Sequence, residues 1–430
     1  MHRPNIPIRQ IFGLDYADDV DGIDIPSDKR SSMRHLYWNG VFSLFSEGLT
    51  ASYTNLFLLA LGASNTQIGF LNTITQIATA IAPLPGATLA ERSGQYRTQV
   101  VLPNVVARLG LLMVALVPYV HFGLPVVSMA IGLLVARVVL TSFTTASWTA
   151  FVGHLIPSRI RAKYFSARTF AMNITNMLGA FLAGQLITAI GTPMGYSVTF
   201  VLACVIGLMA SWSFARIPNH HYPQRASPNS DTPVTPAMSF RVMLRSSPQF
   251  ARFVLCACIL AIGVNIGGPF IQVYQVRMLG FSAGNIGLLT SLEALSTLVM
   301  GRLFGSIFFA KYGDFRVMRV LRFCTALIPF GWIFAPSVGW GVLIVLIAGA
   351  VWSGHELAYF NGLLAVTPEH GRARFIALHT LAISLCAAIG PVVGGVLSET
   401  IGYQALFALS AGLRVTAAVM FVFLVKDWNQ

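Results

Sequence analysis

Charged residues are scarce in this chain. Asp, Glu, Lys and Arg make up 10% of its 430 residues, whereas soluble domains carry roughly a quarter. A soluble protein of this length would form two or three domains, each needing a polar surface. Apolar residues instead make up 55% of the chain, and the mean hydropathy is +0.69. The composition therefore predicts an integral membrane protein and excludes collagen-like, disordered and disulfide-scaffold classes.

Sequence motifs for chemistry are also missing. The chain has no GxxxxGK[ST] phosphate-binding loop, no nucleophile elbow, no HExxH and no paired-cysteine metal box. Its five cysteines fall in or beside apolar runs, where we expect them to be small packing residues. We therefore expect no catalytic residue, no enzyme activity, no bound metal and no cofactor.

What the chain does have is long apolar runs. A spanning helix needs about 20 mostly apolar residues, because the hydrocarbon core is about 30 Å thick. Backbone polar groups in lipid must be satisfied within their own element, so these runs are expected to be helices. Twelve such runs occur, at 38–61, 66–90, 99–118, 124–150, 165–188, 195–215, 250–275, 283–309, 318–336, 340–365, 375–397 and 402–424. The predicted fold class is all-α integral membrane, with twelve transmembrane helices.

Lys and Arg are distributed unevenly between the two sides of these runs. With the N-terminus in the cytoplasm, nearly all of them lie on the inside, including the Arg316, Arg319 and Arg322 series, while Arg277 alone lies outside. This asymmetry predicts that both termini are cytoplasmic. The net charge of +13 then reflects topology and anionic lipid, and we expect no nucleic-acid partner.

The two halves of the chain repeat. Residues Pro157, Arg161, Gly179, Gly184 and Gly191 recur, at one constant spacing, as Pro368, Arg372, Gly390, Gly395 and Gly402. Two six-helix pseudo-repeats of like topology would surround a midplane site. The expected organisation is a cytoplasmic tail at 1–36, a first half at 37–215, a cytoplasmic linker at 216–249, a second half at 250–425 and a cytoplasmic C-terminus at 426–430.

A charged glycine-rich loop follows the second apolar run. It contains Gly86, Glu91, Arg92, Gly94 and Arg97, and a degenerate copy contains Gly305, Lys311, Gly313 and Arg316. A carboxylate and cations at facing helix ends can hold two helices together, and glycines permit close approach and tight turns. Alternatively, the arginines only anchor the topology.

This loop resembles the cytoplasmic loop signature of the major facilitator superfamily of secondary transporters, and the likeness covers nearly the whole chain. Arg137 resembles that family's fourth-helix arginine, although the glycine that usually follows is absent. The Gly390-Pro391 pair lies in the eleventh run, whereas the family's antiporter signature stands in the fifth. The resemblance implies the family fold, a cytoplasmic gating role for both loops, and a cavity lined by the first, fourth, seventh and tenth spans.

Ionisable groups inside the runs are candidates for function. Such a group costs at least about 2.5–3.5 kcal/mol at mid-bilayer. Glu47, Arg137 and the His355–Glu356 pair fall in runs that the resemblance places around the cavity. We hypothesise that Glu47 pairs with Arg137 and that Glu356 with His355 carries a proton, although either pair could simply lock helices together.

Further polar and aromatic side chains of these runs are candidate cavity residues, although they equally suit helix packing. They are Asn265, Gln272, Tyr274, Trp352, Tyr359 and Asn361. Arg108, Arg302 and Arg414 are expected instead to reach inward to carbonyls or to Glu293.

The predicted function is transport of a small organic solute by alternating access, coupled to protons. The expected partners are that solute, protons and the lipid bilayer, the expected state is a monomer, and the expected location is the bacterial cell inner membrane. A second interpretation stays open, in which a transporter-like membrane protein acts as a sensor or regulator, or handles lipid, without moving a solute.

Overall fold

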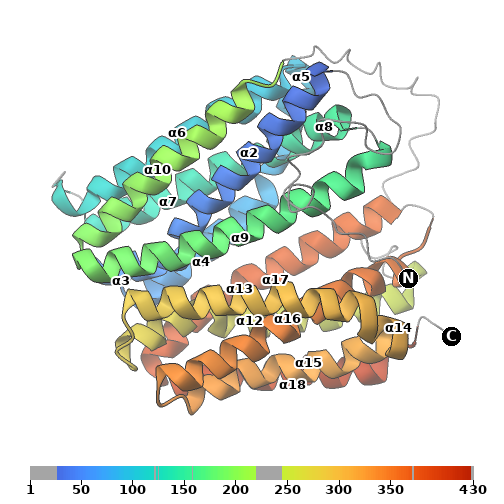
Figure 1. Cartoon of the computed structure of the whole chain (residues 1–430). Helices are drawn as coiled ribbons and strands as arrows, with labels where there is room; N and C mark the ends of the chain where they lie inside the picture. Colours follow the sequence, from blue (N-terminus) through green and yellow to red (C-terminus); the bar gives the residue numbers. More distant parts are fainter. Residues whose placement is uncertain are drawn as a thin grey trace, which may run out of the picture. The chain divides into compact units, whose positions relative to one another are not determined.

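The computed structural model describes residues 27–120, 123, 125–156, 158–218, 245–369 and 372–427. Most of the predicted N-terminal tail and of the 216–249 linker lie outside these residues. The described part is helical and contains no strand (Figure 1). The all-α prediction is therefore confirmed for the residues that the structure describes.

The helices follow the predicted runs. Their bounds are α2 Ser27–Thr50, α3 Thr54–Ala60, α4 Asn65–Ile81, α5 Pro83–Ser93, α6 Tyr96–Leu116, α7 Val126–Phe143, α8 Thr145–Leu155, α9 Ser158–Ile190, α10 Met194–Ala215, α12 Pro248–Arg277, α13 Ala283–Leu303, α14 Phe309–Tyr312, α15 Asp314–Ile333, α16 Val338–Val366, α17 Arg372–Thr400 and α18 Gly402–Leu424.

Nine helical segments of the described residues are long and apolar enough to cross a membrane. The first, second and ninth predicted runs are not among them. A 3₁₀ turn at Ala51–Tyr53 separates α2 from α3, and α5 starts anew at Pro83 after α4. Helix α15 carries three arginines in its first half. The chain is a multi-pass membrane protein, and the full count of twelve spans stays a prediction.

Large apolar side chains on the helix surfaces agree with a lipid surrounding. Phe423 is 81% exposed, Leu84 68% and Met278 63%. A soluble protein rarely exposes many such side chains together, whereas lipid tails are as apolar as these side chains.

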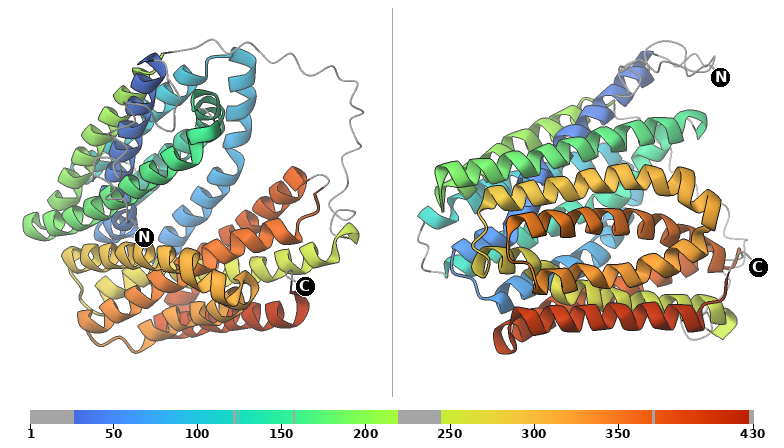
Figure 2. Two further views of the ribbon diagram at one scale, coloured as in Figure 1. Left: turned by 45° about the vertical axis from the view of Figure 1, so that its right-hand side comes forward. Right: turned by 60° about the horizontal axis from the view of Figure 1, so that its bottom comes forward.

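The chain divides into two compact units. Unit 1 comprises Met1–Thr54 and Ile81–Arg225, and unit 2 comprises Asn55–Ala80 and Ala226–Gln430. In unit 1, α2 packs against α9 and α10, while α6 packs against α7 and α10. In unit 2, α12 packs against α17 and α18, while α15 packs against α16 and α18 (Figure 2). The two sets of packed pairs correspond helix by helix in chain order, as the sequence repeat predicts.

Helix α2 approaches α9 closely because glycines line their contact. A β-carbon on Gly48 would overlap the carbonyl oxygen of Asn176, and one on Gly179 would lie 2.6 Å from the carbonyl oxygen of Phe45. Small residues are the usual means of bringing membrane helices together. This packing fixes the part of α2 that carries Glu47.

Helix α4 packs with the second half of the chain, although the sequence repeat assigns it to the first. Asn65 on α4 donates to Ser398 Oγ over 2.9 Å and to Tyr403 Oη over 2.7 Å, and it accepts from Arg277 over 3.0 Å. A β-carbon on Gly69 would overlap the carbonyl oxygen of Pro391. The start of α4 is therefore joined to α12, α17 and α18 within unit 2.

Candidate functional site

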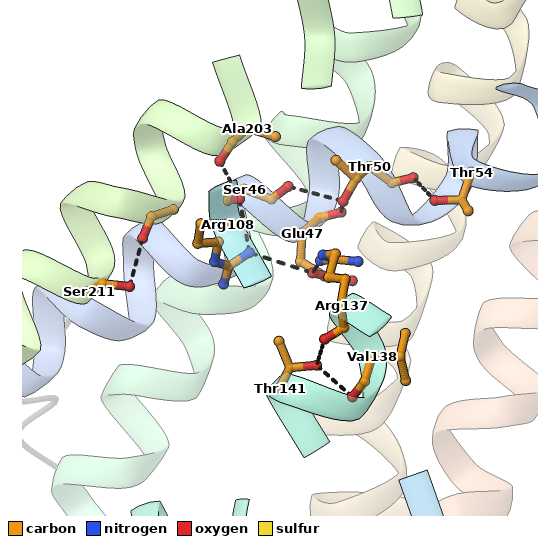
Figure 3. A network of polar contacts seen from close by, with 11 residues as sticks. Ser46, Glu47, Thr50, Thr54, Arg108, Arg137, Val138, Thr141, Ala203 and Ser211 are labelled. Carbon is orange, nitrogen blue, oxygen red and sulfur yellow. Dashed lines mark hydrogen bonds and ion pairs between the residues drawn. The ribbon is translucent and has the colours of Figure 1, made fainter. Parts of the chain in front are cut away.

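Glu47 and Arg137 are in direct contact inside unit 1. Arg137 Nη2 on α7 donates to Glu47 Oε2 on α2 (Figure 3). The Glu47 side chain is 42% exposed and the Arg137 side chain 9%. The carboxylate is therefore partly accessible from outside the cluster, whereas the guanidinium is buried. The structure thus places these two predicted residues together, and their role in proton coupling stays a prediction.

Arg108 also belongs to this cluster, which sequence reasoning missed. Its Nη1 donates to Ser46 Oγ over 3.1 Å and lies 4.0 Å from Glu47 Oε2. Ser46 in turn donates to the carbonyl oxygen of Ala203 over 2.7 Å. The side chain of Arg108 occupies space that a β-carbon on Gly207 of α10 would fill. One carboxylate therefore faces two guanidinium groups, and the cluster carries a net positive charge when all three are ionised.

A second polar group of residues lines a cavity in unit 2. The cavity has a volume of about 510 Å³ and is lined by Asn265, Trp352, His355, Glu356 and Tyr359 among others. These five predicted residues come from α12 and α16. The His355 ring lies 5.7 Å from the ring of Tyr359 and stacks on it, while Trp352 meets its edge at 5.6 Å. Glu356 is exposed at this cavity.

The other predicted cavity residues lie elsewhere. Tyr274 is buried against Tyr403 and Phe407, with ring centroids 5.6 Å and 5.2 Å away. Asn361 donates to Asp314 Oδ2 over 2.7 Å, and Gln272 does not line the described cavity of unit 2.

The two glycine-rich loops differ in their packing. A β-carbon on Gly86 would overlap the carbonyl oxygen of Phe143, whereas one on Gly305 would meet nothing within 4 Å. Gly94 and Gly313 both have a positive φ, at 64° and 76°, as tight turns after helices require. The glycine of the first loop therefore allows α5 and α7 to approach closely. The second loop has the same kind of tight turn but no such close contact at its glycine.

The charged residues of these loops make few described contacts. Arg97 Nη1 donates to the carbonyl oxygens of Ile217 and Ala215 at the end of α10, over 3.1 and 3.3 Å. Lys311 lies 5.1 Å from the ring centroid of Tyr312. Arg92 and Arg316 are exposed, and the side chain of Glu91 lies outside the described residues. The gating role of both loops stays a prediction.

Two further arginines of unit 2, Arg414 and Arg322, have buried side chains. Arg414, 2% exposed, donates to the carbonyl oxygen of Thr325 over 2.8 Å and to that of Gly263 over 3.5 Å. Arg322, counted above with the cytoplasmic arginines, has a fully buried side chain in α15, and its place on the cytoplasmic side stays a prediction. Arg316, Arg319 and Arg322 are spaced three residues apart on this helix, and of the three it is Arg322 whose side chain is buried.

Comparison with known proteins places the chain in a family. The sequence profile of the Major Facilitator Superfamily matches residues 36–365. The quinolone resistance protein NorA of Staphylococcus aureus is 27% identical over 174 residues, which cover 39% of this chain and 43% of NorA. The multi-drug resistance efflux pump PmrA homolog of Lactococcus lactis is 30% identical over 37% of this chain and 40% of that protein. The chain thus matches less than half the length of these curated relatives.

Solved structures show the same fold over most of the chain. A bacterial homologue of the iron transporter ferroportin superimposes with a TM-score of 0.72 at 16% identity, covering 92% of this chain and 99% of that one. A D-xylose–proton symporter superimposes with a TM-score of 0.69 at 15% identity, covering 93% and 98%. The residues, the helix arrangement and the profile agree, and the chain belongs to the Major Facilitator Superfamily, the family of secondary transporters that its loop motif resembles.

Proposed function

We propose that this protein is a proton-coupled secondary transporter that moves a small organic solute across the bacterial inner membrane by alternating access, with both termini in the cytoplasm. The observation that carries the proposal is the contact of Glu47 with Arg137 in the presence of Arg108. A carboxylate held by two cations inside a membrane protein is a group whose partner changes when it gains or loses a proton.

The exposure of Glu47 supports a role in coupling. Its side chain is 42% exposed, while those of Arg137 and Arg108 are 9% and 7% exposed. A proton can therefore reach the carboxylate without the guanidinium groups leaving their places. Protonation removes the negative charge, and the two arginines are then available to a solute or to another arrangement of the helices.

The packing of α4 supports alternating access. Thr66 N and Oγ1 donate to the two carboxylate oxygens of Glu399 over 3.1 and 2.7 Å, beside the Asn65 hydrogen bonds. These contacts are polar and few, so their loss costs little relative to the hydrophobic packing inside each unit. A helix that the repeat assigns to the first half can then separate from α17 and α18 in the opposite state of the carrier.

The names of the relatives favour export of organic compounds. NorA is named for quinolone resistance and the PmrA homolog for multidrug efflux, and the unit 2 cavity offers the aromatic side chains Trp352 and Tyr359 that suit aromatic solutes. The sensor and lipid-handling interpretations predict no solute flux.

Transport into inside-out vesicles tests the proposal. The purified protein is reconstituted, a quinolone is added outside, and uptake is followed with and without an imposed pH gradient, acidic inside. We expect uptake that requires the protein and collapses when an ionophore dissipates the gradient. Uptake equal to that of protein-free vesicles for quinolones and for a wider panel of organic solutes would contradict the proposal.

A further inference from the structure

Unit 1 contains a cavity of its own, and two buried arginines line it. The cavity has a volume of about 250 Å³ and lies among α2, α6, α8, α9 and α10. Arg108 on α6 is 6% exposed and Arg168 on α9 is 5% exposed, and both are lining residues. None of the described residues that line the cavity is Asp or Glu. Because arginine stays protonated in proteins, the described lining carries two positive charges and no negative one.

Each of these arginines keeps a terminal nitrogen that is not used within the described chain. Arg108 donates through Nη1 to Ser46 Oγ, and Arg168 donates through Nε to the carbonyl oxygen of Leu36 over 3.2 Å. Nη2 of Arg108 and both Nη atoms of Arg168 make no hydrogen bond to a described residue, yet each keeps some accessible surface. The space that both side chains line is this cavity, so these donors are available to an acceptor inside it.

Glycines on neighbouring helices hold both guanidinium groups in place. A β-carbon on Gly40 of α2 would lie 2.6 Å from Arg168 Cζ, and one on Gly207 of α10 would lie 2.7 Å from Arg108 Nε. Arg168 Cζ also lies 5.3 Å from the ring centroid of Trp148, which lines the same cavity. Because packing already fixes these long side chains, binding of an anion costs little of their rotamer freedom.

The equivalent positions of unit 2 hold a different pair of residues. At the spacing of the sequence repeat described above, Trp148 corresponds to Tyr359 and Arg168 corresponds to His379. Tyr359 and His379 are joined directly by a hydrogen bond between their side chains. The helix packing that the two halves share is therefore formed without an arginine at this position. The charge of Arg168 needs a reason other than the fold.

We propose that the unit 1 cavity binds a tetrahedral oxyanion, either free phosphate or sulfate or the phosphate of a lipid headgroup, with Arg108 and Arg168 as its two cations. Two guanidinium charges balance a dianion, and each guanidinium presents paired N–H donors that match phosphate oxygens. Ser43 and Trp148 line the same cavity and add a hydroxyl and an indole N–H. Donors on α2, α6, α8 and α9 suit an anion with four oxygens better than a planar carboxylate.

The size of this cavity separates it from a site for the transported solute. Pockets for drug-sized ligands have volumes of roughly 300–1,000 Å³. The unit 1 cavity, at about 250 Å³, is smaller than that range, whereas the unit 2 cavity, at about 510 Å³, falls within it. The oxyanion site is therefore an addition to the proposed transport function and does not depend on it.

Equilibrium dialysis with radiolabelled ions tests the site. The full chain is purified in detergent, stripped of lipid, and dialysed against radiolabelled sulfate or phosphate, with sodium chloride holding the ionic strength constant so that screening does not change. Direct binding is measured because sulfate and phosphate raise melting temperatures without binding to a site. We expect a single saturable site that unlabelled sulfate or phosphate competes for and acetate does not.

Arginine variants test the two cations. Arg108→Met and Arg168→Met should each weaken binding by at least about tenfold, because each removes charge-assisted hydrogen bonds to the ion. Arg168→Lys should keep part of the affinity, since lysine keeps the charge but not the paired donors. Arg414→Met is the matched control, because it removes a buried arginine that does not line this cavity, and it should bind as wild type does.

Two substitutions at Ser43 separate loss of the site from general damage, because both leave the arginines in place. Ser43→Leu adds an apolar side chain that fills the cavity and should abolish binding. Ser43→Ala removes only the hydroxyl group and should weaken binding less. Melting temperatures of the two variants show that both are folded.

The source of the oxyanion is found with the same residues. If it is a lipid headgroup, wild type purified without the stripping step carries a phospholipid that Arg168→Met lacks, as a phosphorus assay shows, and this lipid blocks the labelled ion. If it is a free ion, wild type binds the label before and after stripping. Both results support the site.

Two results overturn the site. One is the absence of saturable sulfate or phosphate binding in lipid-stripped wild type. The other is binding as tight as that of wild type in either Arg108→Met or Arg168→Met.

Discussion

Arg108 on α6 lies 4.0 Å from the carboxylate of Glu47 on α2, although the family resemblance implies a cavity lined by the first, fourth, seventh and tenth spans, and Arg108 belongs to the third. It reaches this position across the surface of α10, where Gly207 leaves room for its side chain. A second cation beside the Glu47–Arg137 contact distinguishes this cluster from a simple ion pair, because loss of the proton leaves one carboxylate facing two guanidinium groups.

Gly207→Ala should displace Arg108 without changing any charge. The added β-carbon would overlap Arg108 Cδ, so the guanidinium must withdraw from Ser46 and Glu47. We expect solute-driven proton flux in vesicles to fall several-fold, and the melting temperature to fall as well, because the buried Arg108 loses its hydrogen bond to Ser46. Gly110→Ala on α6, where a β-carbon meets nothing within 4 Å, is the control, and equal flux in both variants would contradict a role for Arg108.

Gly48→Ala should destabilise the protein. The new methyl group would overlap the backbone carbonyl of Asn176, and α2 and α9 cannot separate without losing packing, so overpacking of about 1–3 kcal/mol is expected. Gly132→Ala on α7 has open space and should be neutral or slightly stabilising, since alanine favours a helix by up to ~1 kcal/mol over glycine. Thermal melts in detergent would show the opposite signs, and a loss of stability equal in the two variants would contradict the close approach.

Gly69→Val should hinder the packing of α4 on α17. Its side chain would meet the backbone of Pro391 and Val392, and the adjacent hydrogen bonds of Asn65 and Thr66 would be weakened. We expect transport to drop more than tenfold with the fold retained, together with greater reactivity of a cysteine placed at Ser398. Gly412→Val on α18, with open space around it, should transport as wild type does.

Arg414→Met should lower stability by about 1–3 kcal/mol. The substitution removes the Arg414 hydrogen bond to the carbonyl oxygen of Thr325, while that of Gly263 still accepts from Ser410 Oγ over 2.6 Å, and a buried hydrogen bond that is lost costs about that much. Arg302→Met, in the last turn of α13, is the control. Melting temperatures of the two variants in the same detergent provide the comparison, and equal values would mean that Arg414 stabilises nothing.

The helix positions were predictable because lipid imposes a simple rule. Apolar runs of about 20 residues must form helices, and every predicted run coincides with a helix or an interrupted helix among the described residues. The repeat of Gly179 and Gly184 as Gly390 and Gly395 likewise indicated that the two sets of helices pack alike.

Side-chain reach was harder to predict. Arg108 and Arg322 lie on helices assigned to the outside of the cavity or to its cytoplasmic edge, and an arginine side chain extends far enough to leave the face on which its Cα lies. The glycine at position 207 was the available signal for Arg108. For Arg322 the signal was its three-residue spacing from Arg316 and Arg319. Residues at this spacing turn gradually around a helix, and the third of these arginines lies on the buried face of α15.

The packing of α4 in unit 2 had no signal in the sequence pattern. The repeat identifies which helices are equivalent, but it says nothing of which partner a helix holds in a given state of the protein. Asn65 and Glu399 carry the contacts, and as single polar residues near helix ends they look like ordinary caps.

Solute-driven proton flux in vesicles containing Glu47→Gln tests the central claim most directly. A pH-sensitive dye is enclosed, a solute gradient is imposed, and the internal pH is followed for wild type, Glu47→Gln, Glu356→Gln and the control Glu293→Gln, a glutamate on α13 outside both clusters. The account predicts flux in wild type and Glu293→Gln and its loss in Glu47→Gln, with solute binding retained. Proton flux in Glu47→Gln equal to that of wild type would contradict the account, whatever Glu356→Gln shows.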